Sequence, residues 1–305
     1  MLAPVITPFD SALRPDHSRF VGHCRWLLDQ GVGLAVFGTN SEANSMAVAE
    51  KLALLEALIG AGLPPARMMP GTGCCALTDS VELTRRAVEL GCTGVLMLPP
   101  FYYKSVSDDG LFRSYAEIIE RVADDRLRIY LYHIPPVSQI PISLALIGRL
   151  LSAYPGIVAG IKDSSGEWSN TQAMLERFRA QGFDVFAGSE KFLLATLRGG
   201  GAGCITAVAN VNPGPIAELA RRWQDADADA KQAALDAVRA TLQKWPMIPA
   251  LKATLAHHAA DAQWATVRPP LVELRLAEQQ ALVGSLSGLG FSMPGLPEAK
   301  RGAWY

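Results

Sequence analysis

One lysine stands where an apolar segment gives way to small polar residues. Lys162 ends the run Ile157-Val-Ala-Gly-Ile-Lys162, and Asp163-Ser-Ser-Gly166 follows it. This pattern predicts a buried strand that carries the lysine at its C-terminal end. Three roles are open to this side chain: a stem on apolar surface with its ammonium in water, a charge that binds an anion, or an amine that forms an imine. The third role requires a neutral amine, which desolvation or a nearby cation favours.

A phenol is expected beside this amine. In the preceding apolar run, Tyr130 and Tyr132 share one face by period-two alternation, as Gly160 and Lys162 do in theirs. If both faces point into one core, Tyr132 and Lys162 are neighbours at the same rim, and Gly160 leaves room for the lysine stem. An amine next to a phenol can make an imine while the phenol relays protons.

A second cluster of polar residues follows an earlier apolar run, in Gly38-Thr39-Asn40-Ser41-Glu42. Backbone amides at a helix N-terminus, together with the Thr39 and Asn40 side chains, would hold a carboxylate. The alternative is a simple helix cap at Asn40 or Ser41. With a carboxylate site present, the expected substrate of the lysine is a 2-oxo acid.

Eight short apolar or β-branched runs alternate with segments of helical period. The expected strands are 2–7, 32–37, 67–71, 94–98, 128–132, 157–162, 183–187 and 203–208. The segments between them are long enough for crossover helices, and eight βα units in succession close a barrel. We therefore predict an α/β protein with a (β/α)8 TIM barrel over residues 1–224. An open doubly wound sheet would need a glycine fingerprint after the first strand, where the chain has Thr7-Pro-Phe-Asp10.

The pattern changes after residue 224. Residues 225–283 have helical period without a further strand, which predicts a C-terminal helical appendix. Residues 284–305 are expected to form a poorly ordered tail or a contact arm.

Composition narrows the class of protein. The chain has 305 residues, of which 50% are hydrophobic and 19% charged, with a net charge of −1. It can bury a large core, and the absence of a basic block argues against nucleic acid as a partner. The start lacks signal-peptide features, and no apolar run approaches the ~18 residues of a membrane span. We expect a cytoplasmic protein without a membrane partner.

Metal ligands are not arranged in a recognisable set. The five cysteines lack metal or redox spacing, which fits reduced, buried thiols. His257 and His258 are adjacent, so on a helix they point about 100° apart and cannot face one ion together. We expect no metal and no cofactor.

Taken together, the motifs resemble those of the dihydrodipicolinate synthase / N-acetylneuraminate lyase superfamily of class I, Schiff-base aldolases. They run in family order over most of the chain. The matching segments are Gly38-Thr-Asn-Ser-Glu42, Pro100-Phe-Tyr-Tyr103, Tyr132-His-Ile-Pro135, Gly160-Ile-Lys-Asp163, Gly188-Ser-Glu190, Gly200-Gly-Ala-Gly203 with Ile205-Thr206, and Val267-Arg-Pro-Pro270. The resemblance implies that Lys162 forms the imine and that Tyr132 relays protons.

Further roles follow from the same resemblance. Thr39 and Asn40 occupy the positions of the carboxylate-binding pair, and Ile205 would pack on bound pyruvate. Tyr103 matches a tyrosine that reaches the site of a neighbouring subunit, which implies a homo-oligomer, usually a tetramer built as a dimer of dimers. Catalytic roles are thus expected for Lys162, Tyr132, Thr39 and Tyr103.

Departures from the family pattern bear on the substrate. Dihydrodipicolinate synthases carry an arginine two residues after the Pro135 position, where this chain has Val137. Loss of that charge-assisted bond, worth ~1.5–3 kcal/mol, disfavours aspartate semialdehyde as second substrate. Asp163-Ser-Ser and Asn40 are closer to the oxo-deoxy sugar acid and 4-hydroxy-2-oxoglutarate aldolases. Ser41 replaces a usual glycine, and His133 a usual asparagine.

The predicted activity is that of a lyase that forms an imine with pyruvate or a related 2-oxo acid and reversibly cleaves a 4-hydroxy-2-oxo acid. The alternatives are a dehydratase of a 2-oxo-3-deoxy sugar acid, a condensation like that of dihydrodipicolinate synthase, and a catalytically silent 2-oxo acid binding protein. Four residues are candidates for contacts to the aldehyde half, or else are turn and cap residues: Ser164, Ser165, Glu190 and Thr206.

Overall fold

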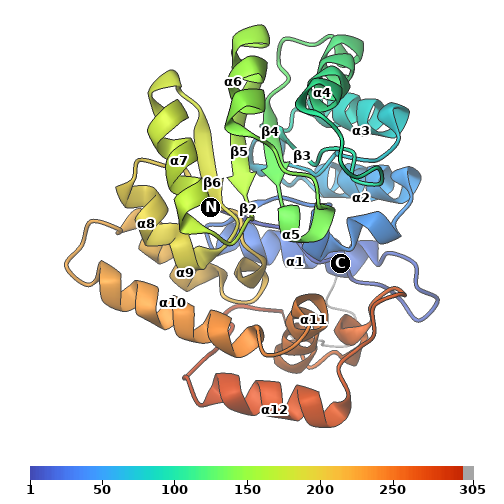
Figure 1. Ribbon diagram of the computed structural model, residues 1–305. Coiled ribbons are helices and arrows are strands. Elements are labelled where there is room, and N and C mark those ends of the chain that lie inside the picture. Colours follow the sequence, from blue (N-terminus) through green and yellow to red (C-terminus); the bar gives the residue numbers. More distant parts are fainter. Residues whose placement is uncertain (298–305) are drawn as a thin grey trace. The chain divides into compact units, whose positions relative to one another are not determined.

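The computed structural model describes residues 1–297 (Figure 1). The chain forms two compact units. One comprises Pro64–Ile205, and the other combines Met1–Leu63 with the chain from Thr206 onward. The first unit contains Lys162, and the second contains the segment around Thr39.

The unit Pro64–Ile205 is built on a five-stranded parallel sheet with strand order β3-β4-β5-β6-β7. The strands are β3 Val95–Met97, β4 Ile129–His133, β5 Val158–Asp163, β6 Asp184–Ala187 and β7 Gly203–Cys204. The helices are α3 Leu77–Glu89, α4 Asp108–Val122, α5 Pro135–Ser138, α6 Leu144–Ala153, α7 Trp168–Phe178 and α8 Leu193–Arg198, with short 3-10 turns η3 Pro65–Arg67, η4 Arg179–Gln181 and η5 Glu190–Phe192. Each strand from β3 to β6 is thus followed by at least one helix, as βα units require (Figure 1).

The third expected strand, at 67–71, is reduced to one parallel bridge between Gly71 and Leu96. The carbonyl of Pro70 accepts a hydrogen bond from the Leu96 amide at 2.9 Å, and the Thr72 amide donates to the Leu96 carbonyl at 3.0 Å. Pro70 has no N–H to donate, so pairing cannot extend as a full ladder. The prediction of a full strand at 67–71 was therefore wrong about its length.

The register between β4 and β5 shifts once. Ile129 is paired with Val158 and Tyr130 with Gly160, so Ala159 is an extra residue, a β-bulge at the start of β5. Beyond the bulge, Tyr132 is paired with Lys162 and His133 with Asp163. Because side chains alternate along a strand, the first pair lies on one face of the sheet and the second on the other.

Two glycines make room for the Tyr130 ring, Gly160 in β5 and Gly94 directly before β3. A Cβ on Gly160 would lie 2.7 Å from the Tyr130 ring and 2.4 Å from the Asp184 carbonyl oxygen, and a Cβ on Gly94 would lie 2.8 Å from the same ring. The nearest atoms to that position belong to the Asp184 carbonyl and the Tyr130 ring, and the expectation that Gly160 leaves room for the lysine stem stays a prediction.

The second unit begins with a two-stranded parallel sheet of β1 Leu2–Ala3 and β2 Gly33–Leu34. Buried Asn210 extends the ordered backbone beyond β1: its amide oxygen accepts from the Ile6 N–H at 3.0 Å, and its nitrogen donates to the Pro4 carbonyl at 3.1 Å. The helical elements are α1 His17–Asp29, η1 Thr39–Ser41, η2 Ala43–Ser45, α2 Val48–Gly60, η6 Ala207–Asn210, α9 Pro213–Arg221, α10 Ala228–Leu242, α11 Met247–His258, η7 Ala262–Ala265 and α12 Leu276–Ser287.

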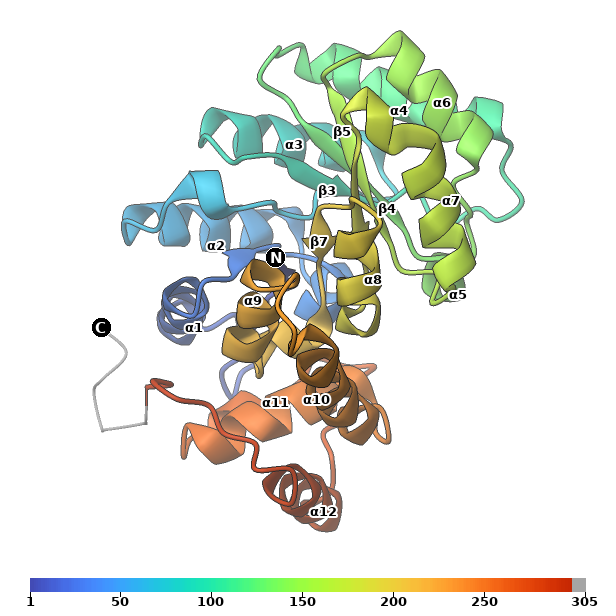
Figure 2. The ribbon, with the colours of Figure 1, turned by 90° about the vertical axis from the view of Figure 1, so that its left-hand side faces the viewer.

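The C-terminal helices α10, α11 and α12 contact one another and lie side by side (Figures 1 and 2). Helix α12 ends at Ser287, whereas the sequence placed the end of the helical region at residue 283. The chain beyond it packs on α1, because the Pro294 carbonyl accepts a hydrogen bond from the Trp26 indole at 3.0 Å and Leu296 is buried. The rest of the expected tail, residues 298–305, lies outside the described residues. None of the helices in the described part is long and apolar enough to cross a membrane.

Candidate functional site

Lys162 and Tyr132 meet at the C-terminal ends of β5 and β4. Both side chains are buried, each with 2% of its surface exposed. The Lys162 nitrogen lies 4.1 Å from the centre of the Tyr132 ring. The sequence prediction that the two residues are neighbours on adjacent strands is confirmed by their register. An amine held out of bulk water against a phenol can attack a carbonyl and exchange protons with the phenol.

The other face of the same strands holds Asp163 by several hydrogen bonds. Its carboxylate accepts from the Thr171 hydroxyl at 2.6 Å, from the Ser165 amide at 2.9 Å and from the Ser165 hydroxyl at 3.1 Å. Thr171 belongs to α7, so the residue next to Lys162 ties β5 to the helix that follows it. These bonds fix the backbone that carries the lysine.

His133 lies on this face, with its Nε2 atom 4.0 Å from the Asp163 carboxylate. Burial lowers the pKa of His133, and the negative charge of Asp163 opposes that shift. Its Nδ1 atom accepts a hydrogen bond from the Ile142 amide at 3.0 Å. The neutral ring therefore carries its proton on Nε2, which faces Asp163.

The two serines after the lysine differ in their surroundings. Ser164 lies against Gly188, where an added Cβ would come within 2.0 Å of the serine hydroxyl. Ser165 donates its hydroxyl to Asp163 and receives the Glu167 amide at 3.2 Å, so it organises the turn into α7. Among the described contacts, the Ser164 hydroxyl makes no hydrogen bond of this kind within the turn.

Tyr102 and Tyr103 stand on the surface of the same unit, 74% and 75% exposed, with their rings edge to face at 5.3 Å. Lys104 ties this loop down, because its ammonium donates to the Ser138 carbonyl at 2.8 Å. Val137, in α5, is also exposed, at 61%. Large exposed apolar side chains that gather in one region are typical of an interaction surface.

The segment with Thr39 and Asn40 forms the short helix η1, in which both residues are half-buried. The Ser41 hydroxyl accepts a hydrogen bond from the Gly38 amide at 3.0 Å, and the Thr7 hydroxyl donates to the Ser41 carbonyl at 2.8 Å. Ser41, where relatives were expected to have glycine, thus closes the turn itself. Thr39 and Asn40 begin a helical turn, as a carboxylate-binding segment requires.

Glu42 follows this turn and is buried with Lys252 of α11. The two form an ion pair in which neither side chain has exposed surface. Burial lowers the pKa of Lys252 to about 8, against the opposing effect of the Glu42 charge. Sequence reasoning missed Lys252, although a lysine inside the apolar segment Ala250-Leu-Lys-Ala-Thr-Leu255 was a visible signal.

The remaining predicted residues are buried. Ile205 has no exposed surface, and its amide donates to the Ala187 carbonyl at 2.9 Å. Glu190 lies in η5 and is fully buried. Thr206 begins the stretch of chain that returns to the other unit, and its hydroxyl accepts from Arg239 of α10 at 3.4 Å.

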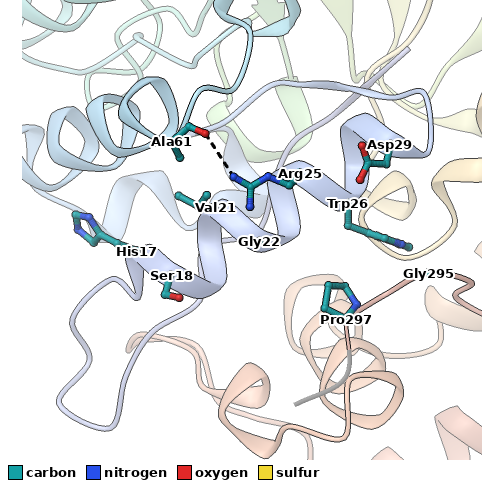
Figure 3. A pocket seen from close by; sticks show the side chains of 10 residues that line it. All are labelled: His17, Ser18, Val21, Gly22, Arg25, Trp26, Asp29, Ala61, Gly295 and Pro297. Atoms are coloured by element: carbon teal, nitrogen blue, oxygen red, sulfur yellow. Dashed lines mark hydrogen bonds between the residues drawn. The ribbon is translucent and has the colours of Figure 1, made fainter. Parts of the chain in front are cut away.

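A cavity of about 580 Å³ runs along α1 (Figure 3). Residues of α1, Ala61 and the chain at Gly295 and Pro297 line it, and the Arg25 guanidinium donates to the Ala61 carbonyl at 3.4 Å across it. None of its ten lining residues is a predicted site residue. Within the described residues, no group of three or more His, Cys, Asp or Glu side chains is arranged to hold a metal ion.

Comparison with known proteins supports the sequence resemblance. Residues 1–288 match the model of the Dihydrodipicolinate synthetase family. An uncharacterized DapA-like lyase of Chloroflexus aurantiacus is 36% identical over 289 residues, covering 92% of this chain and 94% of the relative.

Two solved structures share the fold. Dihydrodipicolinate synthase from Agrobacterium tumefaciens superposes with a TM-score of 0.87 at 31% identity, covering 94% of this chain and 98% of that one. The 2-keto-3-deoxygluconate aldolase of Sulfolobus, in complex with D-KDPG, gives 0.85 at 21% identity, covering 95% and 96%. The fold class is the predicted one, a TIM barrel with a C-terminal helical region, and the protein is an enzyme of the class I aldolase and lyase type. The chain belongs to the dihydrodipicolinate synthetase family.

Proposed function

We propose that this lyase forms an imine between Lys162 and pyruvate or a related 2-oxo acid, and reversibly cleaves a 4-hydroxy-2-oxo acid into pyruvate and an aldehyde. The observation that carries the proposal is the buried pair in which the Lys162 nitrogen lies 4.1 Å from the centre of the Tyr132 ring.

The reaction begins at the ketone carbon. The Lys162 amine adds to C2, and the phenol of Tyr132 protonates the carbinolamine hydroxyl, which leaves as water and gives the iminium and a phenolate. The phenolate takes the proton of the C4 hydroxyl, the C3–C4 bond breaks, and its electron pair forms the enamine while C4 departs as the aldehyde. Tyr132 then protonates C3, and addition of water, whose proton returns to Tyr132, releases pyruvate and the free amine.

Thr39 and Asn40 are assigned to bind the carboxylate of the 2-oxo acid. The support is local: both residues lie in the first turn of η1 and are half-buried, and a threonine hydroxyl and an asparagine amide are side chains that can donate to a carboxylate. Ile205, Ser164, Glu190 and Thr206 remain proposed contacts to the substrate, whereas Ser165 is better supported as a turn residue by its bonds to Asp163.

We propose that the aldehyde partner is not aspartate semialdehyde, because the arginine expected to bind its carboxylate is missing. Val137 occupies the relevant position in α5 and offers no charge. The exposed Tyr102 and Tyr103 support the further proposal of a homotetramer in which Tyr103 reaches a neighbouring subunit's site. A cytoplasmic location is proposed from the sequence alone. The second candidate function is dehydration of a 2-oxo-3-deoxy sugar acid. It would use the same imine and is supported by the same buried pair of amine and phenol.

Borohydride reduction in the presence of pyruvate tests the mechanism. We expect one adduct per chain, located at Lys162 by peptide mapping and absent from Lys162→Ala. The mapping is decisive because Lys252 is a second buried lysine with a pKa lowered to about 8. An adduct at Lys252, or none at saturating pyruvate in a folded protein, would contradict the proposal. Product analysis then separates pyruvate plus aldehyde from a dehydrated oxo acid.

A further inference from the structure

The C-terminal helical region contributes a fully buried cation to the segment that carries Thr39 and Asn40. Lys252, in the middle of α11, has no exposed side-chain surface and pairs with Glu42. Its nitrogen also donates to the Thr266 carbonyl at 2.7 Å and lies 4.4 Å from the centre of the Phe9 ring. A carboxylate, a carbonyl and an aromatic face thus surround one ammonium.

Glu42 is the corner of the segment. It ends η1 and begins η2 with φ at +57°, a left-handed conformation that costs energy for a residue with a side chain. Such a conformation persists where surrounding contacts fix it. The second oxygen of Glu42 accepts a hydrogen bond from the Arg268 amide at 2.8 Å, so both carboxylate oxygens are held by residues of the C-terminal region.

Arg268 secures the far end of the same segment. Its guanidinium donates to the Ser45 carbonyl at 2.7 Å and to the Glu50 carboxylate at 2.8 Å, and lies 4.6 Å from the centre of the Phe9 ring. The segment from Thr39 to Ser45 is therefore held at its corner by the Lys252 side chain and the Arg268 amide, and at its end by the Arg268 side chain, all more than 200 positions away in sequence.

Stability alone is a weak explanation for the pair. Moving the charges of a lysine and a glutamate out of water costs more free energy than forming a pair at the surface. Well-packed apolar residues of similar size can often replace such a buried pair without lowering the stability of the fold. The best-attested use of a buried polar pair is to hold a single geometry. Here the geometry held is that of the turn directly after Thr39 and Asn40.

We propose that Lys252 and Arg268 are positioning residues: through Glu42 they hold the Thr39–Ser41 turn in the shape that binds the carboxylate of the 2-oxo acid. The C-terminal helical region thereby sets the preference of the enzyme for 2-oxo acids over simple ketones. This inference rests on the proposed function of Thr39 and Asn40.

The test compares two ketones. Pyruvate carries the carboxylate, and hydroxyacetone offers a ketone without it. Imine formation with each is measured by borohydride trapping over a range of concentrations in wild type and in Glu42→Gln/Lys252→Met, a double variant that leaves no unpaired buried charge. Lys231→Met is the matched control, because Lys231 is also a paired lysine of the C-terminal region, bonded to Asp227 at 2.8 Å, but contacts no residue of the Thr39–Ser45 segment in the described contacts.

We expect the double variant to weaken pyruvate binding at least about tenfold, the scale of a misaligned charge-assisted hydrogen bond, while hydroxyacetone changes less than about twofold. A purely structural role would weaken both ketones alike. Equal weakening, or no change in either, overturns the proposal. Lys231→Met should match wild type for both ketones.

Thr39→Val separates this inference from the function on which it rests. Loss of the pyruvate preference in Thr39→Val but not in the double variant removes the positioning role and leaves the carboxylate role standing. Retention of the preference in Thr39→Val removes the carboxylate role and, with it, the inference. An adduct at Lys162 in wild type establishes the imine in either case.

The pH dependence of ketone binding in the wild-type protein tests the same proposal without a variant. The charged groups around Lys252 are Glu42, Glu273 and Arg268, and burial lowers its pKa to about 8. Raising the pH from 7 to 9 removes its proton and leaves Glu42 without its cation. We expect the ratio of pyruvate to hydroxyacetone affinity to fall several-fold over that range, whereas effects on the imine-forming lysine cancel in the ratio. A constant ratio contradicts the proposal.

Discussion

At the scale of single residues, the proposed imine cycle assigns the nucleophile to Lys162 and the proton relay to Tyr132. In this proposal the lysine supplies the covalent bond, and the phenol oxygen moves protons among the carbinolamine, the C4 hydroxyl and C3. Removing the phenol oxygen therefore leaves the nucleophile intact and slows every proton transfer.

We predict that Tyr132→Phe retains a trappable pyruvate adduct at Lys162, formed more slowly, while turnover falls by roughly a hundredfold to ten-thousandfold. Rapid-quench trapping and steady-state pyruvate release measure the two quantities. Tyr115→Phe is the control, because Tyr115 is also a buried tyrosine of this unit but lies in α4. Equal turnover in Tyr132→Phe and wild type would show that another group relays the proton.

A buried histidine makes the protein sensitive to acid. Burial lowers the pKa of His23 to about 4, with a smaller opposing effect of its contact to Asn210. Its ring also packs against Trp26 at 5.6 Å and Trp264 at 5.3 Å between centroids. Between pH 6.5 and 4 the unfolded chain binds a proton at this site that the folded chain does not.

The stability contributed by neutral His23 is thus fully present above pH 6.5 and is lost progressively as the pH falls towards 4, by up to about 3 kcal/mol. We predict that His23→Gln has a flatter fall in the free energy of unfolding over this range, measured by urea titration at several pH values. Parallel curves for variant and wild type would assign the acid sensitivity to other groups.

Part of the site follows from sequence at this scale, and part does not. Period-two alternation in two apolar runs is enough to predict that Tyr132 and Lys162 are neighbours. The surroundings of Asp163 and the pairing of Glu42 with Lys252 are not predictable in this way, because they join residues 8 and 210 positions apart through tertiary packing.

At the scale of elements, the Tyr130 ring of β4 finds its place where two neighbouring positions have no side chain. The Tyr130 hydroxyl donates to Asp184 at 3.1 Å, and its ring fills the space beside Gly160 and Gly94. Burial, with a smaller effect of the Asp184 charge, raises the pKa of Tyr130. The phenol therefore stays protonated and keeps donating.

We predict that Gly160→Ala lowers the free energy of unfolding by about 3 kcal/mol, because the added Cβ meets a backbone oxygen at 2.4 Å and cannot be accommodated by a rotamer change. Gly284→Ala is the matched control: Gly284 lies inside α12, nothing lies within 4 Å of its Cβ position, and alanine favours helix by about 0.5–1 kcal/mol. Chemical denaturation of both variants measures the difference. A Gly160→Ala protein as stable as wild type would mean that the strands can separate without cost.

Helix starts carry a local sequence signal that strand ends lack. Helix starts such as Ser107 and Ser143 are marked by side chains that cap the first turn, with the Ser143 hydroxyl accepting from the Leu146 amide at 3.0 Å. Strand ends carry no comparable local signal, since a strand exists only where a neighbour supplies the ladder. The segment at 67–71 shows this, because three backbone hydrogen bonds join its surroundings to residues 93–96, yet only Gly71 forms a bridge, with Leu96.

At the scale of the whole molecule, the most informative surface is the one that carries Tyr102 and Tyr103. Two aromatic rings with about three quarters of their surface exposed bury little on folding of a single chain. They gain most of their hydrophobic stabilisation only when another surface covers them.

We predict a homotetramer by native mass spectrometry, in which Tyr103 of one subunit serves another subunit's site. Lys162→Ala and Tyr103→Ala proteins are dissociated, mixed and allowed to reassociate. The mixed oligomers should then recover part of the activity that each variant lacks. Activity of Tyr103→Ala equal to wild type, or no recovery on mixing assembled hybrids, would contradict a shared site.

The bulge at Ala159 has a consequence for how this chain can change in length. Insertions and deletions of one residue in a strand normally invert which side chains face the reaction, so losing Ile161 would turn Lys162 away from Tyr132. Ala159 has no partner in β4, and β5 beyond it is already in step with β4. Ala159 is thus the position in this strand at which one residue could be deleted while Lys162 keeps its place opposite Tyr132.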